Sequence, residues 1–321
     1  MFDFQLMQLI AAINIDLLLP VVCVKIKPMK IEKYLKDYSE LKNKTVLITG
    51  AAGGIGSEVA KHFAYIGAKL IFANRNIEKA EKLANEIKQT QPETEITILP
   101  LDLCSTESVS NFLTEVQNFH VDIFIHNAGI YNVPRQTTSL GFDNVYQTNC
   151  LMPYLICKKL MPWFKQNDTK VIYMGSIAYN YSKINPTNVQ FLNNKKVNKI
   201  YGNSKRIAMC ALLELFKFNP DVSFSIAHPG LTLTQMTNHY PKGFNWLVKV
   251  ALKMVCPPPK NAGLSLIYAC THDTNNNQWI GPCVFNIWGK PKCNKLILPE
   301  HERRFAYAEL EKQDESLQEK I

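Results

Sequence analysis

The stretch from Lys44 to Phe63 constrains the fold of this chain more than any other segment. Residues 45–48 are short, apolar and β-branched, which is typical of a strand buried on both faces of a parallel sheet. Residues 49–56 then include four glycines, and from Ser57 apolar residues recur at the period of a helix. Because a helix that begins at a glycine-rich turn presents unpaired N–H groups, this turn is predicted to bind a phosphate.

A glycine-rich turn also occurs without any ligand, so its sequence context must distinguish the two cases. A second strand follows at 69–73, at the spacing of a β-α-β unit. Further strand patterns at 95–99, 121–126, 170–175, 222–227 and 284–287 alternate with helical patterns at 77–89, 105–118, 201–218 and 261–270. This rhythm predicts an α/β fold, a doubly wound parallel sheet of the Rossmann type, which binds ligands at the carboxyl ends of its strands.

The length of the chain fits a single domain with extensions. Of its 321 residues, 46% are hydrophobic, enough for one α/β domain of about 250 residues. We expect an apolar and basic N-terminal extension over residues 1–43, a dinucleotide-binding domain over 44–290 and a charged C-terminal tail over 291–321. Within this tail, residues 300–321 are expected to form an exposed helix or a frayed end.

The charge and the cysteines argue against several kinds of partner. The net charge is +9, but the basic runs at 25–36 and 193–199 are short, so we expect a solvated basic surface and no nucleic-acid partner. The nine cysteines form no C-x-x-C pair and have no metal-like spacing with histidine. They indicate buried thiols in a reducing compartment, so we expect a cytoplasmic protein without a bound metal.

The first 27 residues are apolar but interrupted, with Asp3 and Asp16 among them and Pro20 in the most apolar part. A membrane-spanning helix needs about twenty mostly apolar residues, and an aspartate near its centre costs several kcal/mol. We therefore favour an interfacial or packing helix, then a membrane anchor with the rest of the chain in the cytosol, and last a cleaved signal. Peripheral membrane contact through residues 1–27 stays open. Residues 31–41 are predicted to form a short amphipathic helix.

The glycines of the turn are arranged as T-G-x-x-x-G-x-G, at Thr49, Gly50, Gly54 and Gly56. This spacing resembles the short-chain dehydrogenase/reductase family. The resemblance implies an enzyme that transfers a hydride between a nicotinamide cofactor and a small-molecule carbonyl or alcohol. It also implies that these four residues, together with Ile55, lie at the cofactor.

The end of the second strand is predicted to set the cofactor preference. A carboxylate there would bind the ribose 2′-hydroxyl of NAD, but this chain has Asn74 and Arg75. A guanidinium can pair with a 2′-phosphate, so we expect NADP rather than NAD, unless Arg75 only covers the helix that follows. Asp102 and Leu103 follow the third strand, and the carboxylate can accept from the adenine amine. Alternatively it caps the next helix, a role that Ser105 can also fill.

The fourth strand ends in His126-Asn127-Ala128-Gly129, which resembles the N-N-A-G motif of the family, with His126 as a departure. Small residues at this point let the backbone approach a ribose. The Asn127 side chain is expected to tie neighbouring strands together. The resemblance therefore implies that Asn127, Ala128 and Gly129 lie at the cofactor.

Ser176, Tyr201 and Lys205 form the predicted catalytic set. Ser176 follows the fifth strand at the ligand edge, and Tyr201 and Lys205 share one helical face at i, i+4 spacing. A neighbouring ammonium favours the phenolate, so Tyr201 can give a proton to a carbonyl oxygen or remove one in the reverse direction. Asn149, in the helix after the fourth strand, completes a tetrad in the family's order. By itself, Asn149 is equally well explained as a packing amide.

The resemblance assigns roles to this tetrad. It implies that Ser176 hydrogen-bonds the substrate oxygen and that Asn149 holds a water in a proton relay. It also implies that Tyr201 and Lys205 lie at the cofactor, with Lys205 in contact with the nicotinamide ribose.

Three further features follow from the resemblance. Pro229 and Gly230 end the sixth strand and are expected against the nicotinamide, and Thr234, at the family spacing, is expected near its carboxamide or the diphosphate. An insertion at 179–198 is similar to that of retinol dehydrogenase-like members, and is expected to shape the substrate entrance. The amphipathic residues 244–255 lie where the family keeps a substrate lid, and they suit a lid and a lipid contact equally well.

We therefore expect an NADP-dependent oxidoreductase that acts on an apolar carbonyl or alcohol, such as a retinoid, a steroid or another lipid-like molecule. Two alternatives stay open: a soluble reductase of small ketones, and a non-catalytic cofactor-binding regulatory protein. The presence of Tyr201 argues against the second alternative, because a protein that only bound the cofactor would not need it. A homo-oligomer also stays open.

Overall fold

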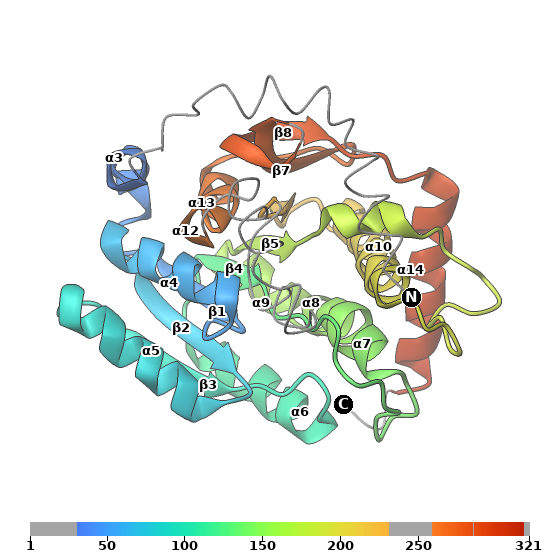
Figure 1. The fold of residues 1–321 in the computed structure, drawn as a ribbon. Helices are drawn as coiled ribbons and strands as arrows, with labels where there is room; N and C mark the ends of the chain where they lie inside the picture. Colours follow the sequence, from blue (N-terminus) through green and yellow to red (C-terminus); the bar gives the residue numbers. More distant parts are fainter. Residues whose placement is uncertain (1–30, 231–258, 285, 318–321) are drawn as a thin grey trace, which may run out of the picture.

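An eight-stranded sheet forms the centre of the computed structural model, which describes residues 31–230, 259–284 and 286–317 (Figure 1). The strand order is β3-β2-β1-β4-β5-β6-β7-β8, and only the last pair, β7 and β8, is antiparallel among the paired strands of the described residues. The strands are β1 (Thr45–Thr49), β2 (Lys69–Asn74), β3 (Ile96–Pro100), β4 (Ile123–His126), β5 (Lys170–Met174), β6 (Phe224–Ala227), β7 (Gln278–Val284) and β8 (Trp288–Lys295). This order confirms the predicted Rossmann-type sheet.

Helices cover both faces of the sheet. They are α3 (Ile31–Leu35), α4 (Gly54–Ile66), α5 (Ile77–Thr90), α6 (Thr106–Glu115), α7 (Asn144–Tyr146), α8 (Met152–Lys159), α9 (Met161–Asn167), α10 (Val197–Lys217), α12 (Pro259–Ala262), α13 (Leu264–Thr271) and α14 (Glu300–Glu315). Short 3-10 turns add η1 (Lys36–Leu41), η2 (Val116–Asn118) and η4 (Ile177–Tyr181), and η3 (Gln147–Leu151) is a turn of π-helix.

The sheet separates two hydrophobic cores. Val46 and Ile48 of β1 point to the core under α4, α5 and α13, while Leu47 points to the core under α6, α8 and α10. Successive residues of a strand face opposite sides, so a strand with a core on each side must be apolar throughout. This explains the unbroken apolar run from which the strand was predicted.

The first crossover departs slightly from its expected boundary. Helix α4 begins at Gly54, three residues before Ser57, and Gly53 holds its N-cap position in an extended conformation. The glycine-rich turn and the first turn of the helix therefore overlap. The predicted amphipathic helix at 31–41 is confirmed as α3 followed by η1, with Leu35 and Leu41 buried under α4.

The predicted last strand, 284–287, is wrong. Val284 is the last residue of β7, while Asn286 and Ile287 lie between β7 and β8, which pair as a hairpin. Gly281 and Pro282 within β7, and Pro291 within β8, are residues that usually interrupt strands, which is why neither segment was recognised. The register of the pair shifts between Pro282 and Val284, as expected for a bulge. Since β8 spans residue 290, the division of the chain at that position stays a proposal.

The C-terminal helix is not the exposed or frayed end that was expected. Over Glu300–Glu315 it packs along α10, and Ala306 and Leu310 are fully buried. The Tyr154 hydroxyl of α8 donates to Glu311, and the Arg206 guanidinium of α10 pairs with Glu302. The helix was judged exposed because it is charged, but several of its charges pair with those of α8 and α10.

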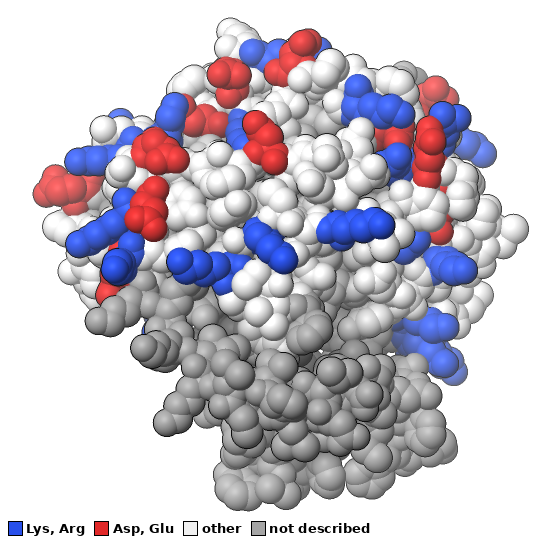
Figure 2. Space-filling view, turned by 90° about the horizontal axis from the view of Figure 1, so that it is seen from above, with Lys and Arg blue, Asp and Glu red and all other residues white. Residues whose placement is uncertain are grey.

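The surface is charged but mixed. On the face shown in Figure 2, acidic side chains lie among the lysines and arginines. Within residues 31–230, 259–284 and 286–317, no helix has both the length and the apolar character needed to cross a bilayer. The segments predicted at 1–27 and 244–255, and Thr234, lie outside the described residues.

Candidate active site

A cleft of about 750 Å³ opens at the carboxyl ends of the parallel strands. Most of the residues predicted from the sequence line it: Gly50, Gly54, Ile55, Gly56, Asn74, Arg75, Asp102, Leu103, Asn127, Ala128, Gly129, Ser176, Tyr201, Lys205, Pro229 and Gly230. Thr49 and Asn149 are buried beside the cleft instead, each 0% exposed. The fold thus brings together residues that are up to 180 positions apart in the chain, from Gly50 to Gly230.

The glycine-rich turn is held tightly by the end of β4. The Asn127 side-chain amide donates to the carbonyl oxygens of Thr49 and Gly50, at 2.9 and 3.1 Å, which confirms that it ties two strands together. The Thr49 hydroxyl accepts from the Ala128 N–H at 2.9 Å, so Thr49 acts through Ala128 rather than on the cleft surface. A Cβ on Gly56 would lie 2.4 Å from the Gly50 carbonyl oxygen, which explains the glycine at this position.

The far end of the cleft, at the end of β2, carries two cations. Arg75 and Lys79 both line it, and Lys79 follows Arg75 by four residues in the first turn of α5. Lys79 was not predicted from the sequence, because Arg75 precedes the N-cap Asn76 and helical spacing therefore does not link the two residues. The buried Asn74 side-chain oxygen has no hydrogen-bond partner among the described residues. An unpaired acceptor beside two cations fits a ligand with a hydroxyl group and a phosphate.

The Asp102 carboxylate has a hydrogen-bond partner in its own loop and also faces the cleft. One of its carboxylate oxygens accepts from the Cys104 N–H at 2.9 Å, and Asp102 lines the cleft. The N-cap of α6 is Ser105, whose hydroxyl accepts from the Ser108 N–H at 3.2 Å. The alternative that Asp102 caps this helix is therefore wrong.

Ser176 and Tyr201 meet at the carboxyl end of β5. The nearby Ser176 side chain lowers the pKa of Tyr201, while burial raises that pKa and has the larger effect. Lys205 lies one turn further along α10 and is only 2% exposed. Burial lowers the pKa of Lys205 to about 7. The arrangement places a protonated phenol next to a serine, with a buried amine beneath them.

Asn149 lies in the π-helical turn η3, directly under Gly129. Its side chain accepts from the Ile130 N–H at 2.8 Å and donates to the Ile130 carbonyl at 2.9 Å and to the Ser204 hydroxyl at 3.1 Å. A Cβ on Gly129 would lie 3.2 Å from the Asn149 side-chain oxygen and 3.5 Å from the Lys205 amine. The glycine thus lets the backbone after β4 approach both groups.

One wall of the cleft near Tyr201 is apolar and aromatic. It is lined by Tyr131, Val133, Pro134, Ile177 and Tyr181, which come from the segment after β4 and from η4. The Tyr131 ring packs edge-on against Tyr201, with 5.1 Å between the ring centroids. Tyr181 belongs to the insertion that was expected to shape the substrate entrance, but the other wall residues were not predicted, because their chain positions carry no motif.

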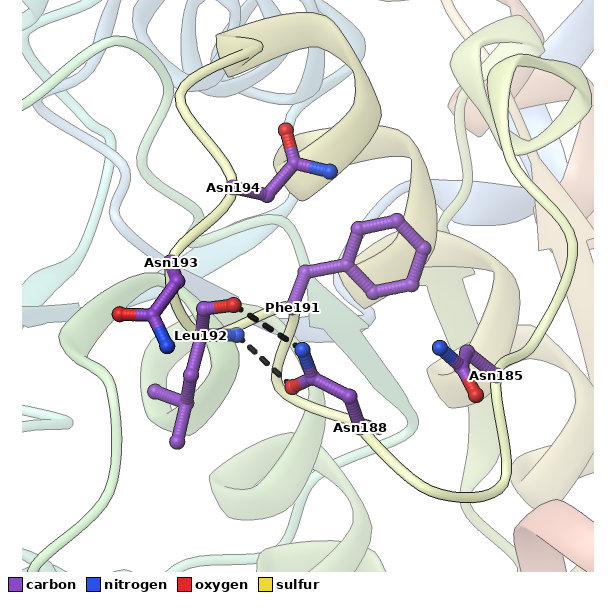
Figure 3. Close-up of a pocket in the computed structure, with 6 residues that line it drawn as sticks. All are labelled: Asn185, Asn188, Phe191, Leu192, Asn193 and Asn194. Carbon is purple, nitrogen blue, oxygen red and sulfur yellow. Dashed lines mark hydrogen bonds between the residues drawn. The ribbon is translucent and has the colours of Figure 1, made fainter.

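The insertion at 179–198 contacts the cleft only with its ends, Tyr181 and Asn198. Its middle encloses a separate pocket of about 230 Å³, shown in Figure 3. There the Asn188 side chain exchanges two hydrogen bonds with the backbone of Leu192, at 2.8 and 2.9 Å, so part of the polar lining is used by the loop itself. The Arg135 guanidinium donates to three carbonyls of this loop and pairs with Asp143, which fixes the insertion against the start of α7.

The loop after β6 is held by a buried histidine. The His228 ring stacks on Trp279 with 3.9 Å between centroids, and its Nδ1 accepts from the Gly230 N–H at 3.2 Å. A Cβ on Gly281 would lie 1.8 Å from the ring, so this strand residue has to be glycine. His228 thereby sets the position of Pro229 and Gly230 at the cleft.

Comparison with known proteins agrees with this architecture. The sequence model described as short chain dehydrogenase matches residues 44–243. An uncharacterized oxidoreductase of Schizosaccharomyces pombe is 30% identical over 272 residues, which cover 78% of each chain. Retinol dehydrogenase 11 of Mus musculus is 27% identical over 276 residues, 84% of this chain and 85% of the relative.

A solved structure shows the same fold. An uncharacterized protein from Mycobacterium paratuberculosis superimposes with a TM-score of 0.67 at 23% identity, over 86% of this chain and 94% of the other. At this identity the likeness concerns the fold alone. The family model over residues 44–243 and the relative that is 30% identical over 78% of this chain show the family: the chain belongs to the short-chain dehydrogenase/reductase family of oxidoreductases.

Proposed function

We propose that this chain is an NADP(H)-dependent oxidoreductase that interconverts a carbonyl and an alcohol on an apolar substrate. The observation that carries the proposal is that Ser176, Tyr201 and Lys205 line the same cleft at the carboxyl edge of β5, with Lys205 one helical turn from Tyr201. A protein that only bound a nucleotide would have no use for a half-buried phenol at this point of the cleft.

The chemistry assigned to the chain's own residues follows from this geometry. A bound nicotinamide would supply or accept the hydride. The Tyr201 hydroxyl, whose pKa is raised by burial, is protonated at neutral pH and can donate to a carbonyl oxygen. The Ser176 hydroxyl orients the same oxygen, and a charged Lys205 stabilises the phenolate that remains. In the reverse direction the phenolate takes the proton of the alcohol.

The cofactor is proposed to lie along the whole cleft. The glycine-rich turn and the unpaired N–H groups of α4 would bind the diphosphate, and Asp102 and Leu103 the adenine. Lys205 would contact the nicotinamide ribose, with Pro229, Gly230 and Thr234 at the nicotinamide. Preference for NADP rests on Arg75 and Lys79, which face the cleft where NAD-dependent proteins place a carboxylate.

The substrate is proposed to be apolar because the wall beside Tyr201 is built from Tyr131, Val133, Ile177 and Tyr181. The retinol dehydrogenases among the relatives fit this substrate class. We also retain the proposals of a cytoplasmic location, of membrane contact through residues 1–27, and of boundaries near residues 43 and 290.

The proposal is tested by turnover. Purified protein is incubated with NADPH or NADH and a panel of retinal, steroid ketones and short aldehydes, while the absorbance of the reduced cofactor is followed. We expect oxidation of NADPH with the apolar carbonyls. Turnover of the short aldehydes alone would favour the small-ketone reductase, and no turnover with any member of the panel would contradict the proposal.

Tyr201→Phe separates catalysis from binding. It removes only the hydroxyl, so NADPH binding, measured by quenching of protein fluorescence, should persist while turnover is lost. The matched control is Tyr65→Phe, which removes the hydroxyl of an exposed tyrosine outside the cleft lining. Equal turnover of Tyr201→Phe and the unmodified protein would refute the assigned role.

A further inference from the structure

A buried tyrosine that no motif singles out, Tyr173, lies beneath Lys205. It is the fourth residue of β5 and 1% exposed. Its hydroxyl lies 3.3 Å from the Lys205 amine, and the amine lies 4.7 Å from the centre of its ring. Tyr173 does not line the cleft, so it cannot reach a substrate or a cofactor.

The Tyr173 hydroxyl donates its own proton away from Lys205. The hydroxyl donates to the main-chain carbonyl of Asn149 at 2.9 Å. In a regular helix this carbonyl would accept from the N–H four residues later, but that residue is Pro153, which has none. The π-helical turn η3 accompanies this break. Pro153 thus leaves an acceptor that orients the tyrosine.

Because the hydroxyl donates to Asn149, it faces Lys205 as an acceptor. An acceptor favours the charged ammonium over the neutral amine. The Met174 carbonyl adds a second acceptor at 2.9 Å. These two contacts oppose the burial that lowers the pKa of Lys205 to about 7. The charge of the lysine near neutral pH therefore depends on them.

The other titratable groups around Lys205 come from three elements. Tyr201 lies on α10 itself, one turn before the lysine. Cys150 of η3 raises the pKa of Lys205, although burial keeps the pKa of its own thiol well above the usual value. His126 of β4 has a pKa lowered to about 3 by burial, so it is neutral and adds no charge. Tyr173 is thus the only titratable group for which the described residues show a hydrogen bond to the lysine amine.

We propose that Tyr173 is a positioning residue of the catalytic centre, which holds Lys205 in its ammonium form beside Tyr201 by accepting from it while donating to the Asn149 carbonyl. The proposal rests on the function proposed above, because the charge of Lys205 matters only if it acts on Tyr201. It assigns this strand residue a role that its position in the core does not suggest.

The test is Tyr173→Phe, which removes the hydroxyl and keeps the ring. The readout is the pKa of Lys205, followed by NMR of the protein labelled with ¹³C at the lysine ε-carbons, with the Lys205 signal assigned from the Lys205→Met spectrum. We expect the pKa of Lys205 to fall by about one unit, since a hydrogen bond to a charged group is lost. An unchanged pKa would overturn the proposal.

The control is Tyr154→Phe in α8, which removes another buried phenol hydroxyl, one that donates to Glu311 away from the cleft. It should destabilise the protein and leave Lys205 unchanged. Should Tyr173→Phe not fold, Pro153→Ala offers a competing N–H to the Asn149 carbonyl. It should lower the pKa of Lys205 in the same direction, and no change would count against the proposal.

The proposed oxidoreductase function and the proposed role of Tyr173 can be refuted by different results. If the protein turns over a carbonyl, Tyr173→Phe should move the high-pH limb of the kcat profile down by about one pH unit, because the ammonium is lost earlier as pH rises. If no carbonyl is turned over, the proposed function fails. The pKa of Lys205 in Tyr173→Phe still decides whether the tyrosine holds the charge.

Discussion

Replacing Arg75 tests the cofactor preference most directly. Arg75 and Lys79 lie at the same end of the cleft, Arg75 just before the N-cap Asn76 of α5 and Lys79 in its first turn. Arg75→Ala removes one of the two cations that would face a 2′-phosphate. It leaves Tyr201, at the other end of the cleft, untouched, so KM for NADPH should change and kcat should not.

The magnitude follows from the exposure of the site. A hydrogen bond to a charged group is worth about 1.5–3 kcal/mol, and Arg75 is exposed, so the lower end applies. At about 1.4 kcal/mol for each factor of ten, KM for NADPH should rise about tenfold. Removing Lys79 as well should raise it further. KM for NADH should stay within about twofold, because NADH has no 2′-phosphate to lose.

The assay is steady-state turnover with each cofactor at saturating carbonyl. Lys88→Ala, in the last turn of α5, removes a cation of the same helix that does not line the cleft, and serves as the control. Equal changes in KM for NADPH and NADH, or equal use of both by the unmodified protein, would refute the reasoning from Arg75.

Three further predictions concern stability and the glycine turn. Gly56→Ala places a Cβ 2.4 Å from the Gly50 carbonyl oxygen, so it should destabilise the fold by about 1–3 kcal/mol and abolish the thermal shift caused by NADPH; an unchanged shift would contradict the packing. Leu310→Ala empties a fully buried position of α14 and should lower the free energy of unfolding in urea by about 2–5 kcal/mol, whereas less than about 1 kcal/mol would mean that the helix is not part of the core. Burial lowers the pKa of Lys205 from 10.5 to about 7, so between these values the unfolded chain binds more protons than the folded one. The free energy of unfolding of the unmodified protein should therefore rise with pH above 7, relative to that of Lys205→Met. If the urea midpoints of the two proteins change with pH in parallel over this range, the lowered pKa of Lys205 is excluded.

The errors of the sequence reading have a common cause. The hairpin of β7 and β8 was missed because Gly281 and Pro282 interrupt the pattern of a strand, yet Gly281 is there to admit the His228 ring. The charges of α14 suggested solvent exposure, yet Glu302 and Glu311 pair with residues of α10 and α8. In both cases a contact with a distant part of the chain overrode the local signal.

The motif residues were found because their signal is local. The strand, the glycine turn and the start of α4 follow one another within about twenty positions, and the Tyr201–Lys205 pair needs only the helical period. The alternation of strands and helices then predicts where the carboxyl ends of the strands meet. Sequence alone therefore determined the fold class, and most of the site residues predicted from it line the cleft.

Only the tertiary structure decided what surrounds those residues. The aromatic wall with Tyr131, the second cation Lys79, and the contact of Tyr173 with Lys205 and the Asn149 carbonyl all join elements far apart in the chain. No periodicity records such contacts, because they depend on how helices and strands pack rather than on neighbours in sequence. The sequence determined where hydride chemistry could take place, and the packing decided how its lysine is held.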